Sequence, residues 1–85
     1  MSKTMNATDV VTAALTAIVP DAAVTGLDQD ADLRDTFELD SLDFLSFVEQ
    51  LSEHSGTRID EDDYDRLRTL RSCVHYLTQH GYPAR

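Results

Sequence analysis

Apolar side chains recur every three or four residues in three separate stretches, which predicts three main helices. The first stretch covers residues 6 to 19, with a suitable N-cap at Asn6, Asp9 three residues later and Pro20 at its end. The apolar stripe of this helix consists of Val11, Ala14, Leu15 and Ile18.

The second helix is predicted from about Ser41 to His54, with Gly56 stopping it. At 100° per residue, one broad arc is apolar and should face the core. Leu42 falls instead within the opposite, polar arc, as an exposed leucine beside the serine. The residues predicted to face the core are Phe44, Leu45, Phe47, Val48 and Leu51.

The third main helix should begin near Thr69, a plausible N-cap, and end at Gly81 and Pro83. Its apolar face consists of Leu70, Cys73, Val74 and Leu77. A short acidic turn or helix should precede it, over residues 60 to 67. Since no segment alternates with period two, the predicted fold is all-α: a four-helix bundle of three main helices and one short helix.

A connection of about 20 residues, from 20 to 40, separates the first and second helices. Connections of this length are uncommon in small domains and are more often functional than idle. Its few apolar residues should hold it against the core. They are Val24, Leu27, Leu33, Phe37 and Leu39.

Length and composition indicate one folded domain over residues 1–85, with its core at about 6–80. The chain has 85 residues, of which 41% are hydrophobic. No apolar run approaches the roughly 20 residues that span a bilayer. The opening MSKTMNATDV has one lysine and no apolar core, so we expect no secretory signal and no membrane insertion. A monomer in the cytoplasm is the prediction.

The charge is strongly negative, with 16 acidic residues against 7 basic ones and a net charge of −9. This balance argues against nucleic-acid binding, which requires a basic surface. Nine of the acids lie between Asp28 and Glu53, where Arg34 is the one basic residue. A partner with a basic surface should therefore meet the middle of the chain.

Cys73 is the only cysteine, which excludes an intramolecular disulfide and a multi-cysteine zinc site. We interpret it as a buried small hydrophobe. The acids Asp28, Asp30 and Asp32 imitate the start of a calcium-binding EF-hand loop. The imitation fails further on, because leucines replace the required glycine and glutamate, so no metal site is predicted.

Two possible roles of Ser41 are those of a helix cap and of a catalytic nucleophile. It could cap its helix, but Asp40 can do so with a favourable charge, which leaves the hydroxyl of Ser41 free to point outward. It could be a catalytic nucleophile, but His54 lies almost four helical turns away, and His75 and His80 belong to the last helix or follow it. No enzymatic activity is predicted, and the histidines are interpreted as surface residues.

The stretch ELDSLDFL resembles the Asp-Ser-Leu motif of acyl carrier proteins. The resemblance extends over roughly residues 8 to 80: Leu33 and Phe37 precede the serine at positions where the family carries core residues, and TLRSCVHYL is similar to its last helix. The Asp-Ser-Leu triplet alone would be weak support for the resemblance. Together with this spacing, chain length and acidity, the triplet is specific to the family.

The resemblance implies a carrier domain whose Ser41 receives 4′-phosphopantetheine from coenzyme A through a phosphopantetheinyl transferase. The arm would carry acyl groups as thioesters between enzymes of fatty-acid or polyketide-type biosynthesis. Partner enzymes with basic patches would engage Asp40, Leu42, Asp43 and Glu49. Residues that could open to shelter a small acyl chain are Phe44, Phe47, Val48, Leu51, Ile59, Leu70 and Val74.

Three departures from the family pattern favour a carrier of a specialised pathway over the housekeeping one. Glu38 stands where many members have glycine, Asp60 where members often have proline, and Glu49 where an apolar partner contact is common. Two other classes remain open. A peptidyl or aminoacyl carrier would use the same arm but typically has glycines before its serine, and a helical interaction module would need no Ser41.

Overall fold

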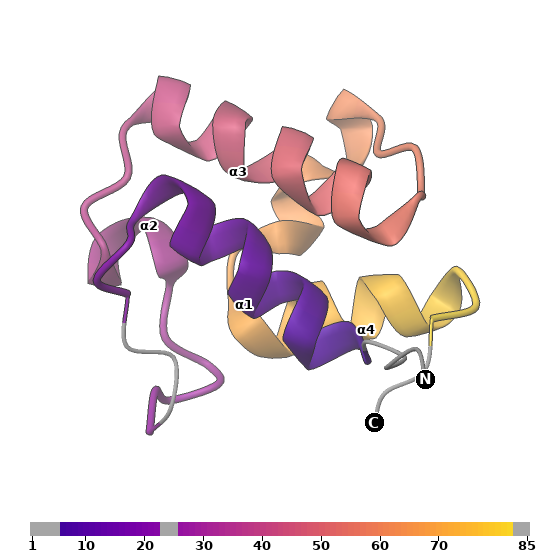
Figure 1. Cartoon of the computed structure of the whole chain (residues 1–85), viewed down its shortest axis with the longest axis horizontal. Coiled ribbons are helices and arrows are strands. Elements are labelled where there is room, and N and C mark those ends of the chain that lie inside the picture. Colours follow the sequence, from indigo (N-terminus) through magenta and orange to yellow (C-terminus); the bar gives the residue numbers. More distant parts are fainter. Residues whose placement is uncertain (1–5, 23–25, 83–85) are drawn as a thin grey trace.

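The computed structural model describes residues 6–22 and 26–82, and the regular elements within them are all helices (Figure 1). The order of elements is α1 (Ala7–Ile18), α2 (Leu33–Thr36), α3 (Ser41–Ser55), the 3₁₀-helix η1 (Glu61–Leu67) and α4 (Leu70–Gln79). The predicted all-α fold is confirmed. Helices α1 and α3 lie side by side, α4 packs against α1, and η1 joins the bundle through α4 (Figure 1).

The predicted helix boundaries are confirmed to within two residues, except that Pro83 lies outside the described residues. Capping residues set most of these boundaries. The Asn6 side chain accepts a hydrogen bond from the N–H of Asp9 at 2.8 Å and caps α1. In the same way, Thr69 caps α4. Gly56 ends α3 in the left-handed conformation, with φ 68°, which glycine adopts without steric cost.

Among the described residues, the core consists of 16 buried apolar side chains from all five helices and the Leu39 turn. It includes most of the predicted apolar faces, with Ile18 and Val74 only partly buried at its edge. Leu45 was predicted to face the core, and this prediction is wrong: its exposed fraction is 44%. Leu45 lies at the rim of the apolar arc, one turn after Ser41, where the helix face turns from the core to solvent.

Helix α2 interrupts the predicted long connection, and the sequence pattern missed it. Four residues are too few to display a helical period. Its N-cap is Asp32, whose carboxylate accepts from the N–H groups of Arg34 at 2.9 Å and Asp35 at 3.1 Å. The prediction that apolar residues hold the connection to the core is confirmed for Leu33 and Leu39, which are buried. Leu27 and Phe37 pack against the core from partly buried positions, and Val24 lies outside the described residues.

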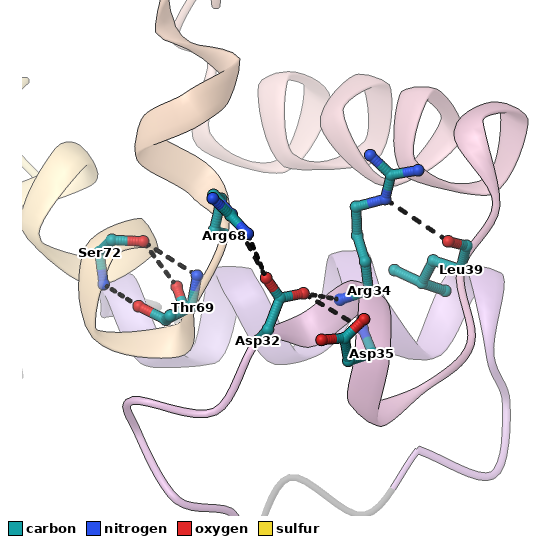
Figure 2. A network of polar contacts seen from close by, with 7 residues as sticks. All are labelled: Asp32, Arg34, Asp35, Leu39, Arg68, Thr69 and Ser72. Atoms are coloured by element: carbon teal, nitrogen blue, oxygen red, sulfur yellow. Dashed lines mark hydrogen bonds and ion pairs between the residues drawn. The ribbon is translucent and has the colours of Figure 1, made fainter.

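The connection is also tied to the junction between η1 and α4 by polar contacts (Figure 2). The backbone N–H of Leu33 donates to the carbonyl of Arg68 at 2.8 Å, and the Arg68 guanidinium pairs with Asp32 at 3.0 Å. Asp30 pairs with Arg71 at 2.7 Å. These contacts hold α2 beside η1, although the two are separated by more than 20 residues of chain.

We predict that Asp32 makes the fold sensitive to acid. The N–H of Asp35 and the guanidinium of Arg68 hold the pKa of Asp32 below its usual range, despite opposing desolvation. The unfolded chain, with an Asp pKa of about 3.9, therefore takes up this proton first. The stabilisation is complete above about pH 4 and is lost as the pH falls through the lowered pKa of the folded state.

Urea unfolding at about pH 5 and about pH 3 tests this prediction. Asp32→Asn should start from a lower free energy of unfolding at pH 5 and lose less of it on acidification than the wild type. Asp62→Asn, at an exposed position of η1, is the matched control and should follow the wild type. Equal losses in wild type and Asp32→Asn would show that Asp32 has no such role.

Cys73 is fully buried, as predicted, and desolvation raises the pKa of its thiol to about 12. The thiol therefore stays protonated and unreactive at neutral pH. In the described part of the chain, no helix is long and apolar enough to cross a bilayer.

Candidate functional site

Asp40, not Ser41, caps α3. The Asp40 carboxylate accepts from the N–H of Asp43 at 2.8 Å, and the Asp43 carboxylate accepts from the N–H of Asp40 at 3.5 Å, which together form a capping box. Ser41 is the first residue of the helix, and its side chain is exposed. The hydroxyl of Ser41 is therefore free for another role.

The backbone turn between α2 and α3 positions Ser41 at the start of its helix. Helix α2 ends in a Schellman motif, in which the N–H of Leu39 donates to the carbonyl of Arg34 at 2.9 Å. This motif requires a left-handed residue before Leu39, and Glu38 takes that conformation with φ 53°. A glycine, which the resemblance to acyl carrier proteins leads us to expect at this position, would take this conformation more easily, because a left-handed backbone is unfavourable for residues with a Cβ.

Glu38→Gly should raise the free energy of unfolding by up to about 1 kcal/mol, since relief of the left-handed strain exceeds the added entropy of the unfolded chain. The matched control is Glu49→Gly, within α3, which should lower it by about 1 kcal/mol. Urea denaturation of both variants measures the difference. If both glycines destabilise the fold equally, Glu38 is not strained.

Ser41 borders an open cavity of about 780 Å³ between α2, the start of α3, and η1. We call it the Ser41 cavity. Six of its eleven lining residues are charged. The lining consists of Asp32, Arg34, Asp35, Leu39, Ser41, Phe44, Leu45, Glu61, Tyr64, Asp65 and Arg68.

An aromatic wall separates the Ser41 cavity from the core. The ring of Phe44 meets the ring of Tyr64 edge to face, with centroids 6.0 Å apart, and lies 6.2 Å from the ring of Phe47. Phe44 and Phe47 are buried, and Tyr64 is half-buried against the core. A group attached to Ser41 therefore enters a cavity of mixed polar and apolar lining, one side of which is formed by Phe44 and Tyr64.

The residues expected to recognise partners lie along one side of α3. Asp40 and Glu49 are exposed, and Leu42 has an exposed fraction of 73%, as its place in the polar arc predicts. Asp43 is half-buried, and its carboxylate is engaged in the helix cap. Glu49 borders a second, smaller cavity of about 460 Å³ farther along α3.

The residues expected to shelter an acyl chain lie mostly in the core. Phe44, Phe47, Val48, Leu51 and Leu70 are buried, while Ile59 and Val74 are half-buried. Of these residues, Phe44 lines the Ser41 cavity, and Val48 and Ile59 line the smaller cavity beside Glu49.

The acids that imitate a calcium loop are engaged otherwise. Asp28 accepts from the N–H of Asp30, Asp30 pairs with Arg71, and Asp32 caps α2. Over residues 6–22 and 26–82, no group of three or more potential ligands is placed to hold a metal ion. The three histidines are exposed, as predicted.

The sequence did not assign Arg34, Tyr64 and Arg68 to the site, although all three line the Ser41 cavity. Tyr64 and Arg68 gave no signal, because their approach to Ser41 depends on how η1 packs. For Arg34 a signal existed, since it is the one base among nine acids.

Residues 11–77 match the family model described as phosphopantetheine attachment site. Among curated proteins, the chain is 31% identical over 52 residues to an acyl carrier protein of Lactobacillus johnsonii and 34% identical over 50 residues to acyl carrier protein 2 of Pseudomonas aeruginosa. These stretches cover 61% and 59% of this chain. The chain spans less than two thirds of each relative, 65% and 63% respectively. No solved structure matches it significantly.

Proposed function

We propose that Ser41 bears a covalently attached 4′-phosphopantetheine, the prosthetic group of the phosphopantetheine attachment family to which the chain belongs. Because the chain is similar to acyl carrier proteins, we propose further that the domain, residues 1–85, delivers acyl intermediates between enzymes. Members of this family are carriers and not enzymes. The observation that supports Ser41 is its free, exposed hydroxyl at the first position of α3, bordering the Ser41 cavity.

The surroundings of Ser41 fit a phosphodiester. The N-terminus of α3 presents backbone N–H groups and the positive end of the helix dipole, both of which favour an anion. Because Asp40 caps the helix, Ser41 Oγ can become the ester oxygen without the loss of a cap bond. When bound, the arm supplies a terminal thiol that carries acyl groups as thioesters.

The cargo that we propose is small. Phe44 and Tyr64 close the path from the Ser41 cavity to the core, and a long alkyl chain would have to displace both rings. The apolar part of the cavity lining is limited to Leu39, Phe44, Leu45 and Tyr64, which suits a short acyl group. These features favour a specialised pathway of fatty-acid or polyketide type over the synthesis of long saturated chains.

The partners that we propose carry basic docking surfaces. Glu49, Asp40 and the exposed Leu42 lie on the outer side of α3 and would give such a surface charged contacts around an apolar one. The phosphopantetheinyl transferase is the first of these partners, followed by enzymes that load and process the acyl group. The cytoplasm as the site of this exchange stays a prediction.

Incubation with coenzyme A and a broad-specificity transferase, followed by intact-mass and peptide-mass measurement, tests the proposal. We expect one phosphopantetheine per chain, on the peptide that contains Ser41. Absence of the added mass, or its location on another residue, would refute the proposal. Transfer assays with acyl and aminoacyl adenylating enzymes would then distinguish an acyl carrier from an aminoacyl carrier.

A further inference from the structure

Arg34 differs from the other arginines in the described part of the chain, because no carboxylate lies within 4.0 Å of its guanidinium there. It nevertheless belongs to the most acidic stretch of the sequence. The other four each form an ion pair: Arg58 with Asp60, Arg66 with Asp63, Arg68 with Asp32 and Arg71 with Asp30.

The side chain of Arg34 is turned away from the nearest acids and towards α3 (Figure 2). Its Nε donates to the carbonyl of Leu39 at 3.5 Å, and its Cζ lies 5.4 Å from the centroid of the Phe44 ring. The Phe44 ring and the Leu39 carbonyl thus hold the Arg34 guanidinium in the lining of the Ser41 cavity.

Local hydrogen bonding explains why Arg34 does not pair with Asp32. The Asp32 carboxylate already accepts from two backbone N–H groups and from Arg68. The terminal Nη groups of Arg34 remain as donors, and Arg34 lines the same cavity as Ser41.

We infer that Arg34 binds an anionic oxygen group carried by Ser41, either the phosphodiester of the arm or a carboxylate of its cargo. A guanidinium presents paired N–H donors that match phosphate and carboxylate oxygens. This inference rests on the proposed function, since it requires a group attached to Ser41. Arg34 would then bind the arm or its cargo through a positive charge, which the acidic surface proposed for partner binding does not offer.

The acids of the Ser41 cavity set the conditions under which this contact forms. Asp35, Glu61 and Asp65 also line it and would repel a free anion. A group tethered to Ser41 has a high effective concentration, of about millimolar order for a short flexible link, and this offsets the repulsion. Arg34 should therefore respond to the attached arm and not to inorganic phosphate in solution.

The test follows the Arg34 Nη–H resonance and its hydrogen exchange by NMR in four states of the protein: unmodified, phosphopantetheinylated, acetyl-loaded and malonyl-loaded. Intact mass first verifies each state. A new contact should shift the resonance and slow its exchange about two- to fivefold, the range for an exposed charge-assisted pair. The ³¹P resonance of the phosphodiester is recorded in wild type, Arg34→Gln and Arg58→Gln, the last being a matched control at an exposed arginine that does not line the cavity.

A response on phosphopantetheinylation, with a ³¹P shift that changes in Arg34→Gln and not in Arg58→Gln, identifies the phosphodiester as the partner. A response that appears only with the malonyl load, and not with the acetyl load, identifies a cargo carboxylate. An unchanged Arg34 resonance in all loaded states overturns the inference while the proposed function stands. Failure of the mass measurement to show any load at Ser41 overturns both.

Discussion

Replacing Ser41 with alanine is expected to abolish phosphopantetheinylation while leaving the helical fold intact. Alanine has no oxygen to form the phosphodiester, so the added mass should vanish completely. The free energy of unfolding should change by less than about 0.5 kcal/mol, because the Asp40 carboxylate, and not the Ser41 hydroxyl, caps α3. Intact mass after incubation with transferase, together with urea denaturation, measures both effects.

Two control variants separate attachment from helix stability. Ser46→Ala, at a half-buried serine of the same helix, should be modified like the wild type. Asp40→Ala should lower the free energy of unfolding by about 1 kcal/mol through loss of the cap. Modification that survives Ser41→Ala would place the arm elsewhere, and a loss of about 1 kcal/mol in that variant would show that Ser41 shares the cap.

The second large effect is expected from a matched pair of leucine substitutions, Leu33→Ala and Leu42→Ala. Leu33 is fully buried and anchors α2, so its truncation should cost about 2–5 kcal/mol. That is a large share of the roughly 4–13 kcal/mol expected for a domain of this size. Leu42 has an exposed fraction of 73%, and its truncation should change stability by less than about 0.5 kcal/mol.

The order of effects should reverse when transfer to partners is measured. Leu42→Ala should lower kcat/KM for modification by the transferase about fivefold or more, the effect of an interface residue that contributes 1 kcal/mol or more. Denaturation curves and steady-state transferase kinetics of both variants suffice. Wild-type kinetics in Leu42→Ala would remove this leucine from the docking surface, and an unaltered stability in Leu33→Ala would contradict its role as an anchor.

Features governed by local chemistry could be predicted from the sequence. Asn6, Gly56 and Thr69 mark helix ends because capping depends on residues within three positions of the boundary. The same reasoning predicted that Asp40 can cap α3 in place of the Ser41 hydroxyl. The apolar period of α3 located its buried face. The exception is Leu45, which lies at the rim of the apolar arc, where the period does not decide between core and solvent.

Features that depend on packing between distant segments could not be predicted. Helix α2 is too short to show a period, and its place beside η1 is fixed by contacts such as the one between Asp32 and Arg68. The direction of the long Arg34 side chain depends on the Phe44 ring and the Leu39 carbonyl, which come together only in the folded chain. The sequence located the serine, therefore, but not the cavity that it borders.

The capping box of α3 also bears on how long the protein survives in a cell. Degradation of a small domain often follows the population of its opened state, which depends on the free energy of unfolding. Because Asp40 and Asp43 close the start of α3 without Ser41, attaching or removing a group at that serine should leave this population nearly unchanged. We therefore expect molecules with and without a group at Ser41 to be degraded at similar rates. The amount of this protein in the cell should then be independent of its loading.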